Sequence, residues 1–218
     1  MSWIHVLAAA AACTAIATAA GWISAAAVIR RLRAQIVILS RLAWQDRLTG
    51  VLNRAGIEDA YTAAADRSRF LVLVDLNEFK SVNDWRGHPT GDQVLAAFGV
   101  RLGDLAARLD GWAGRLGGDE FALVIPTDSQ AVAEAAAIEA AAVITIDPLP
   151  IGPLQVWPSA GVASAPAGRE WAGALAHADI ALYHAKKGSG VTVYQPGMVY
   201  PHPAWPRRQA RDTRRTGQ

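Results

Sequence analysis

The segment 115–125 constrains the fold of this chain more than any other part of its sequence. Gly117–Gly118 allows a tight turn, because glycine accepts positive φ angles that other residues avoid. Asp119 and Glu120 follow at once, and Phe121–Ile125 is an apolar run with the composition of a β-strand. Adjacent carboxylates repel each other unless a cation lies on them, and hard divalent cations prefer oxygen ligands. The segment therefore predicts a β-hairpin whose turn is half of a metal site.

A second acidic segment lies upstream and predicts the other half of that site. Phe70–Leu76 is apolar and rich in residues that favour strands, and Asp75 lies next to its end. A buried strand with an aspartate at its tip is a common way to place a metal ligand. A cation, an amide, a histidine and an acid follow in one stretch, namely Lys80, Asn83, His88 and Asp92.

Five blocks of the sequence, in order, resemble the patterns of the GGDEF family of diguanylate cyclases. Residues 117–121 are a literal GGDEF signature, and residues 75–95 resemble the family's DxDxFKxxNDxxGHxxGDxxL pattern. Asp46–Arg54 is similar to DxLTGLxNR, Ser159–Ala163 to SxGxA, and Ala178–Lys186 to ADxALYxAK. Five ordered blocks are far more specific than a single match of five letters.

The alternation of helices and strands predicts an α/β fold with helices over a mixed sheet, preceded by one transmembrane helix. The resemblance implies that this sheet is a palm-like, ferredoxin-related core of about five strands. Hydrophobic patterns predict helices over 55–66, 93–109, 129–143 and 171–187, and strands over 70–76, 155–163 and 191–194. Residues 79–83 are expected to form a helix or a loop. The expected domains are a transmembrane helix (1–29), a helical linker (30–45), the catalytic domain (46–195) and a disordered basic tail (196–218).

The N-terminal segment Trp3–Ile29 carries no charge apart from a proton on His5. A transmembrane helix needs about 20 apolar residues, so this segment is long enough to cross a bilayer. Arg30, Arg31 and Arg33 follow it and no lysine or arginine precedes it, so the positive-inside rule places the C-terminal part in the cytoplasm. We expect a single-pass anchor in the inner (cytoplasmic) membrane. The alternative is a cleaved signal peptide, but the run is long and no basic n-region precedes it.

The linker and the tail each leave two interpretations open. Apolar residues recur in the linker at spacings of three and four, namely Ile29, Leu32, Ile36, Leu39 and Ala43. This seam would either join two protomers in a short coiled coil or pack against its own domain. The tail has five arginines against one aspartate and is rich in proline, which predicts disorder. It either contacts anionic lipid headgroups or is a solvated segment without a role.

The resemblance also implies roles for the acidic residues. The carboxylates of Asp75 and Asp119 and the backbone carbonyl of Leu76 would hold Mg²⁺. Asp119 would activate the attacking 3′-hydroxyl, with Glu120 as the second candidate for that role. The structural alternative for Asp119 and Glu120 is a solvated turn.

Substrate-binding residues follow from the same resemblance. Lys80 and Lys186 would contact phosphates. Asn83 and Asp92 would read the guanine edge, where an amide and a carboxylate can meet the donors and acceptors of the base. His88 would assist, or else be a hydrogen-bonded structural histidine. Asp92 could instead be a simple helix cap.

Three places depart from the family's pattern. Asn77 stands where a second aspartate is usual, which predicts reduced but not lost metal affinity. Gly190 stands where an arginine often contacts phosphates, so GTP binding could be weaker. In the product-inhibition motif RxxD, Arg108 fits, but Gly111 takes the position of the acid and Asp110 is one residue early. We expect no strong product inhibition.

We expect a diguanylate cyclase that condenses two GTP molecules into cyclic di-GMP plus pyrophosphate, with Mg²⁺. Each domain would bind one GTP, so two copies must face each other, which implies a homodimer. We expect no nucleic acid polymer as a partner. One alternative is a catalytically weak domain that binds GTP or cyclic di-GMP as a receptor, and another is a dimerisation module without a ligand. The absence of a Walker-type phosphate loop argues against a P-loop GTPase.

Overall fold

The computed structural model describes residues 43–147, 152–188 and 190–200, together with isolated positions before residue 43. Contacts divide the chain into the units Met1–Ala43 and Trp44–Gln218. Most of the predicted span 3–29 and of the linker lies outside the described residues, as does the tail from residue 201. Among the residues that the structure describes, no helix is both long enough and apolar enough to cross a membrane.

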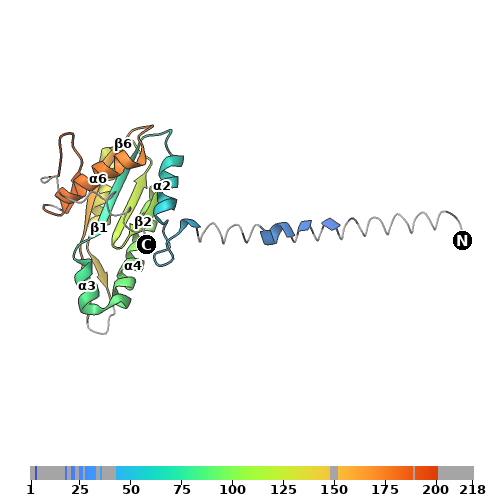
Figure 1. The fold of residues 1–218 in the computed structure, drawn as a ribbon, viewed down its shortest axis with the longest axis horizontal. Coiled ribbons are helices and arrows are strands. Elements are labelled where there is room, and N and C mark those ends of the chain that lie inside the picture. Colours follow the sequence, from blue (N-terminus) through green and yellow to red (C-terminus); the bar gives the residue numbers. More distant parts are fainter. Residues whose placement is uncertain are drawn as a thin grey trace, which may run out of the picture. The chain divides into compact units, whose positions relative to one another are not determined.

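The second unit is built on a mixed sheet of five strands in the order β2-β3-β1-β6-β7 (Figure 1). The central strand β1 pairs antiparallel with β3 and with β6, whereas β6 and β7 are parallel. The prediction of a five-stranded mixed sheet is confirmed. The strands are β1 (Arg69–Leu76), β2 (Trp112–Gly117), β3 (Glu120–Ile125), β6 (Pro158–Ala165) and β7 (Val191–Val193).

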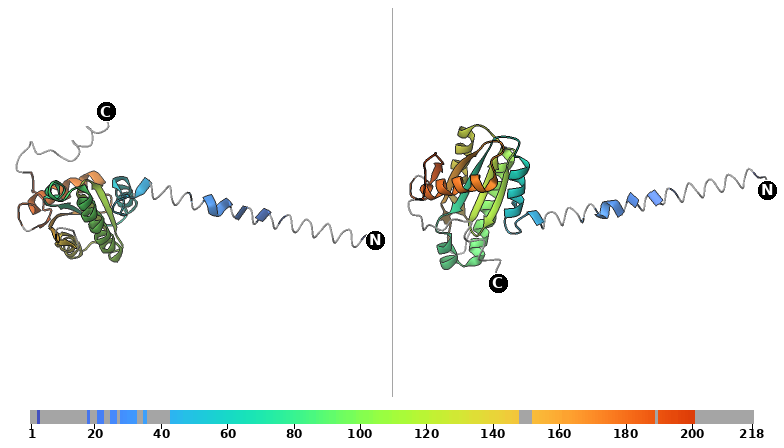
Figure 2. Two further views of the ribbon diagram at one scale, coloured as in Figure 1. Left: turned by 90° about the horizontal axis from the view of Figure 1, so that it is seen from below. Right: turned by 45° about the horizontal axis from the view of Figure 1, so that its top comes forward.

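Helices cover both faces of this sheet (Figure 2). Alternate residues of β1 point to opposite faces, as the pleat of a strand requires. Val72 and Val74 join the apolar core with α4 and α5, whereas Leu71 and Leu73 join the core with α2 and α6. The helices are α2 (Arg54–Ala63), α3 (Phe79–Arg86), α4 (His88–Arg108), α5 (Gln130–Ala141) and α6 (Trp171–Ala185).

Helix α4 begins five residues earlier than the sequence pattern predicted. Its N-cap is Gly87, whose φ of +80° suits glycine, and Pro89 lies in the first turn, where its missing N–H is no loss. Asp92 therefore lies inside α4, and the alternative that it caps a helix is wrong.

The predicted strand 155–163 is two strands. Leu154–Val156 is β5, which pairs with β4 (Ile144–Ile146) in a separate two-stranded sheet, and β6 begins at Pro158. Sequence patterns missed β4 because three residues are too short to show an alternation.

Candidate active site

The site is built around a row of three residues on adjacent strands. Asp75 of β1 lies opposite Glu120 of β3 on one side and opposite Ser159 of β6 on the other. All three share the face of the sheet that α2 and α6 cover, because Asp75 alternates in phase with Leu71 and Leu73. Asp75 is buried, with 8% of its surface exposed. The row therefore sets two acidic residues side by side at one end of the sheet.

Helix α6 brings Lys186 to this row. A Cβ atom on Gly161 of β6 would lie 2.2 Å from the amide nitrogen of Leu182 and 2.3 Å from the carbonyl oxygen of Ala178. The backbone of α6 thus packs directly on β6, which only a residue without a side chain permits. Lys186 follows the last residue of α6, and its Nζ lies 2.7 Å from Oδ1 of Asp75.

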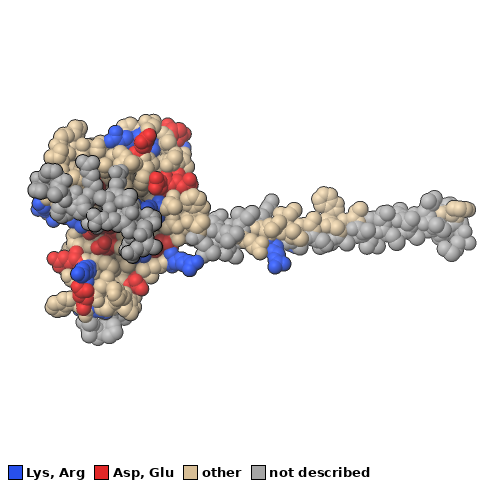
Figure 3. Space-filling model, viewed as in Figure 1, with Lys and Arg blue, Asp and Glu red and all other residues tan. Residues whose placement is uncertain are grey.

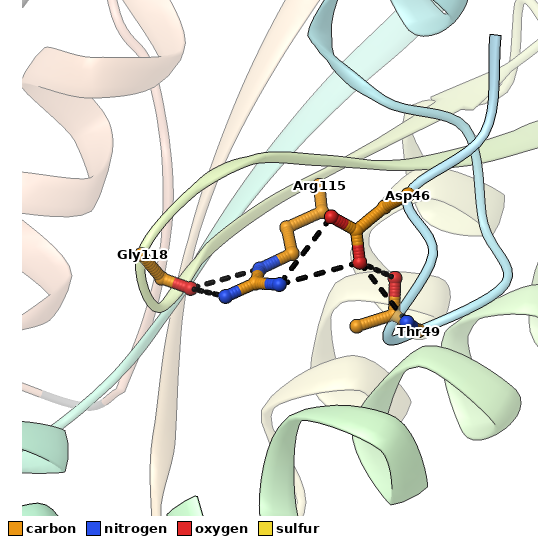
Figure 4. A network of polar contacts seen from close by, with 4 residues as sticks. All are labelled: Asp46, Thr49, Arg115 and Gly118. Atoms are coloured by element: carbon orange, nitrogen blue, oxygen red, sulfur yellow. Dashed lines mark hydrogen bonds and ion pairs between the residues drawn. The ribbon is translucent and has the colours of Figure 1, made fainter. Parts of the chain in front are cut away.

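The hairpin between β2 and β3 provides the turn beside the row. Gly117 and Gly118 have φ angles of +141° and +58°, which accounts for glycine at both positions. Arg115 holds this turn, because its Nε and Nη2 donate to the carbonyl oxygen of Gly118 at 2.9 and 2.7 Å. The same guanidinium lies 3.2 Å from Oδ1 of Asp46, as Figure 4 shows.

Asp46 links this turn to the start of the domain. Its Oδ1 accepts hydrogen bonds from the amide and the hydroxyl of Thr49 at 3.0 and 2.8 Å. Burial opposes ionisation of Asp46, but the bonds from Thr49 and the charge of Arg115 outweigh it, so the pKa of Asp46 is below its usual value. Asp46 and Thr49 lie in one sequence block and Arg115 lies two residues before the signature at 117–121, yet their joint role was not predicted, because Arg115 is far from the other two in the chain.

The predicted metal ligands lie close together. The backbone N–H of Leu76 donates to the carbonyl oxygen of Asp119 at 3.3 Å, so the end of β1 touches the hairpin turn. Two carboxylates and one carbonyl are hard oxygen donors, which fit Mg²⁺. Among the described residues, no cluster of three or more His, Cys, Asp or Glu side chains could hold a metal ion. The predicted ligand set combines two such side chains, those of Asp75 and Asp119, with the backbone carbonyl of Leu76.

Asn77 is tied to β6. Its Nδ2 donates to the hydroxyl of Ser159 at 2.9 Å, and that hydroxyl lies 3.1 Å from Oδ1 of Asn77. The backbone N–H of Asn77 donates to the carbonyl oxygen of Trp157 at 3.1 Å. Asn77 therefore has a structural partner in Ser159, which sequence reasoning had not assigned to the site.

The other predicted substrate-binding residues lie on α3 and α4. Lys80 and Asn83 belong to α3, which starts directly after the end of β1, while His88 and Asp92 belong to α4. Asn83 faces α4, since a Cβ on Gly91 would lie 2.0 Å from its Oδ1. Lys80, His88 and Asp92 are exposed to solvent.

The residues at the positions of the incomplete product-inhibition motif lie at the end of α4 and in the turn that follows. Arg108, at the end of α4, forms an ion pair with Glu139 of α5. Asp110 adopts a φ of +50° in the turn that follows, and the N–H of Gly111 donates to the carbonyl oxygen of Ala106 at 2.9 Å.

Basic and acidic side chains are interspersed on the face of the molecule in Figure 3.

Comparison with known proteins identifies relatives of this chain. The family model described as "Diguanylate cyclase, GGDEF domain" matches residues 43–190. An uncharacterised signalling protein of Caulobacter vibrioides is 36% identical over 77% of this chain and 22% of its own length. Diguanylate cyclase VdcA of Vibrio cholerae is 38% identical over 50% of this chain and 32% of its own length. The chain thus spans a minor part of these curated relatives.

A solved structure shares the fold. The crystal structure of the coiled coil and GGDEF domain of DgcB from Caulobacter crescentus, in complex with c-di-GMP, has a TM-score of 0.68 and 28% sequence identity. The match covers 80% of this chain and 97% of that one.

Proposed function

Because the chain belongs to the GGDEF diguanylate cyclase family, we propose that it condenses two GTP molecules into cyclic di-GMP, with Mg²⁺ as cofactor. The observation that carries the proposal is the row at the end of the sheet. Asp75 and Glu120 are register partners beside the Gly117–Gly118 turn, and Lys186 forms an ion pair with the carboxylate of Asp75. Acids and a cation gathered at one end of a rigid sheet suit phosphoryl transfer, which depends on positioning and charge.

The metal would bind where β1 meets the hairpin. In this proposal the carboxylates of Asp75 and Asp119 and the carbonyl of Leu76 hold Mg²⁺. When bound, the ion would neutralise charge on the phosphates and on the departing pyrophosphate.

The chain's own residues bind and orient the substrate. Lys80 at the start of α3 and Lys186 at the end of α6 contact phosphates. Asn83 and Asp92, which lie on neighbouring helices, read the guanine edge, and His88 assists from the first turn of α4. The Arg115–Asp46 contact keeps the Gly118 carbonyl, and with it the turn, in one position.

In the reaction, the 3′-oxygen of one GTP attacks the α-phosphorus of the other. Its proton passes to the carboxylate of Asp119, or to Glu120 as the second candidate. The bond from the α-phosphorus to the oxygen that bridges to the β-phosphate breaks, and pyrophosphate leaves. A second, identical transfer closes the ring, so two GTP molecules give one cyclic di-GMP and two pyrophosphates.

We further propose that the active form is a homodimer attached to a membrane. Each domain supplies one GTP, so two domains must face each other. The uncharged composition of Trp3–Ile29 supports the anchor, and the heptad-like spacing of the linker supports pairing of two chains.

Turnover of GTP by the full chain in mild detergent tests the proposal. We expect cyclic di-GMP and pyrophosphate in the presence of Mg²⁺, with a rate that rises faster than linearly with protein concentration, because two domains must meet. Asp119→Ala, checked for folding by circular dichroism, should abolish turnover.

Other results would replace the proposal. Binding of GTP or cyclic di-GMP without turnover at high protein concentration would support the receptor. Dimerisation without either ligand would support a structural module.

A further inference from the structure

The ammonium of Lys186 lies at the carboxylate to which a metal ion is proposed to bind. Its Nζ is 2.7 Å from Oδ1 of Asp75. An ammonium and a divalent cation compete for such an oxygen, because both are attracted by the same negative charge.

The two partners of this ion pair differ in freedom. The side chain of Asp75 is 11% exposed and that of Lys186 is 40% exposed. Asp75 is held by its place in the centre of the sheet, between β3 and β6. Lys186 has a flexible stem at the end of a helix, so its ammonium can leave for solvent or for another anion while Asp75 stays.

The surroundings of Asp75 include one neutral and one acidic side chain. The next polar side chain along the strand end is Asn77, which is neutral and bonded to Ser159. Asn77 therefore adds no negative charge to this end of the sheet, whereas Glu120 lies opposite Asp75 on β3, and the ammonium of Lys186 contacts Asp75.

We propose that Lys186 is a built-in competitor for the cation site at Asp75. Without metal, its ammonium neutralises Asp75, and when a metal binds, the ammonium is released to the phosphates of the substrate. This inference rests on the proposed function for the roles of metal and phosphate. It makes the binding of metal and of nucleotide phosphate mutually favourable, because each favours the state in which Lys186 has left Asp75.

In the absence of nucleotide, metal should bind more weakly to the wild-type site than it would if Lys186 did not occupy Asp75. The apparent dissociation constant is raised by the fraction of molecules in which Lys186 occupies the site. Removing the charge with Lys186→Gln should therefore tighten metal binding in the absence of nucleotide, by about fivefold for a pair of this exposure.

The test uses the full chain freed of metal with a chelator. Titration with Mn²⁺, followed by the electron paramagnetic resonance signal of the free ion, gives the affinity of wild type, Lys186→Gln and Lys187→Gln. Lys187 is the matched control, since it is the next residue and its ammonium lies 4.5 Å from the ring centre of Tyr183 instead. We expect tighter binding in Lys186→Gln and no change in Lys187→Gln. Equal affinity in all three proteins, or no binding in any of them, overturns the inference.

A second measurement checks the ion pair itself. In metal-free buffer, Lys186→Gln should unfold at a lower temperature than wild type, because the change leaves the buried carboxylate of Asp75 without the ammonium of Lys186. The same change in an Asp75→Asn background should have a smaller effect. Equal effects in both backgrounds overturn the pair. Lys186→Met replaces the glutamine variant if that variant does not fold.

The turnover experiment separates the two proposals. If wild type makes cyclic di-GMP and the metal affinity of Lys186→Gln is unchanged, the proposed enzymatic activity stands and the competition by Lys186 is ruled out. If Lys186→Gln binds metal more tightly but wild type makes no cyclic di-GMP, the competition stands and the proposed activity is ruled out.

Discussion

Strand β1 buries a charged side chain near each of its ends, and the two are held in different ways. Arg69 at the start of the strand is 1% exposed, and Asp75 near its end is 8% exposed. Both lie on the face of the sheet that α2 and α6 cover, because they alternate in phase along the strand.

At the first end, every partner of Arg69 is part of the fold. Its Nη1 and Nη2 donate to the carbonyl oxygens of Arg67 and Arg169 at 2.9 and 3.0 Å. Its guanidinium lies 3.9 Å from the ring centre of Tyr61, which packs edge-on against Trp171. Backbone oxygens cannot leave, so this charge is part of the structure.

At the other end, the charge of Asp75 is matched by a side chain that can move. Lys186 is partly exposed and approaches from the end of a helix. Burial of a charge therefore does not by itself mark a functional site. What distinguishes the two ends is whether the partner can be exchanged for another ion.

The largest effect should come from breaking the exchangeable end with Asp75→Asn. An amide keeps the shape but not the charge proposed to hold Mg²⁺, so turnover should fall on the order of a thousandfold. The unfolding temperature should change little, since Lys186 can turn to solvent. Initial rates of pyrophosphate release check this, with the exposed Asp128→Asn as control. Activity within tenfold of wild type would contradict the role of Asp75.

Breaking the fixed end should have the opposite signature. Arg69→Leu removes the hydrogen bonds to the carbonyl oxygens of Arg67 and Arg169 and the contact with the ring of Tyr61, and the free energy of unfolding should fall by about 3 kcal/mol. Turnover per folded molecule should remain. Urea denaturation measures this, and Arg67→Leu is the control, because that side chain is 63% exposed. If Arg69→Leu lost activity without losing stability, Arg69 would have a functional role and not a structural one.

Gly161→Ala should affect both stability and activity. A methyl group there would meet the backbone of α6, so the helix must shift, at a cost of about 2 kcal/mol. The shift would also move Lys186 away from Asp75 and lower turnover. Ser164→Ala, an exposed position on the same strand, is the control. If stability falls but turnover per folded molecule does not, α6 does not position the site.

A smaller, pH-dependent effect is expected at Asp46. Its pKa is lowered in the folded protein, so its ionised form contributes stability above the unfolded value of about 4, and this is lost as pH falls through the folded pKa. Asp46→Asn should be about 1 kcal/mol less stable than wild type at pH 7. The difference should shrink as pH falls through the lowered pKa of Asp46 in the folded protein. Urea denaturation across pH checks this, with the exposed Asp59→Asn as control. A difference independent of pH would rule out the assigned cause.

The smallest effect is expected at the exposed pair of Arg108 and Glu139, whose side chains are 55% and 51% exposed. Arg108→Ala should change the unfolding free energy by less than about 1 kcal/mol. Added cyclic di-GMP should not inhibit wild type strongly, and the variant should respond in the same way. Strong inhibition of wild type that the variant relieves would show that Arg108 belongs to an inhibitory site.

Much of the fold was predictable, because local patterns are strong in this chain. The apolar run that ends at Leu76, the Gly117–Gly118 turn and the helix before Lys186 all show in the sequence, and the structure confirms each. The start of α4 was missed because Gly87 and Pro89 are also compatible with a loop. Strand β4 was missed because it is too short for a pattern.

The contacts within the site were less predictable than its residues. The sequence by itself identified the family, the acidic turn and the strand that bears Asp75, since motifs and hydrophobic period are properties of neighbouring residues. Only the tertiary structure decided that Asp75 lies between Glu120 and Ser159, and that Gly161 lets α6 bring Lys186 to it. Strand register and helix packing join residues far apart in the chain, and no local pattern encodes which of them will touch.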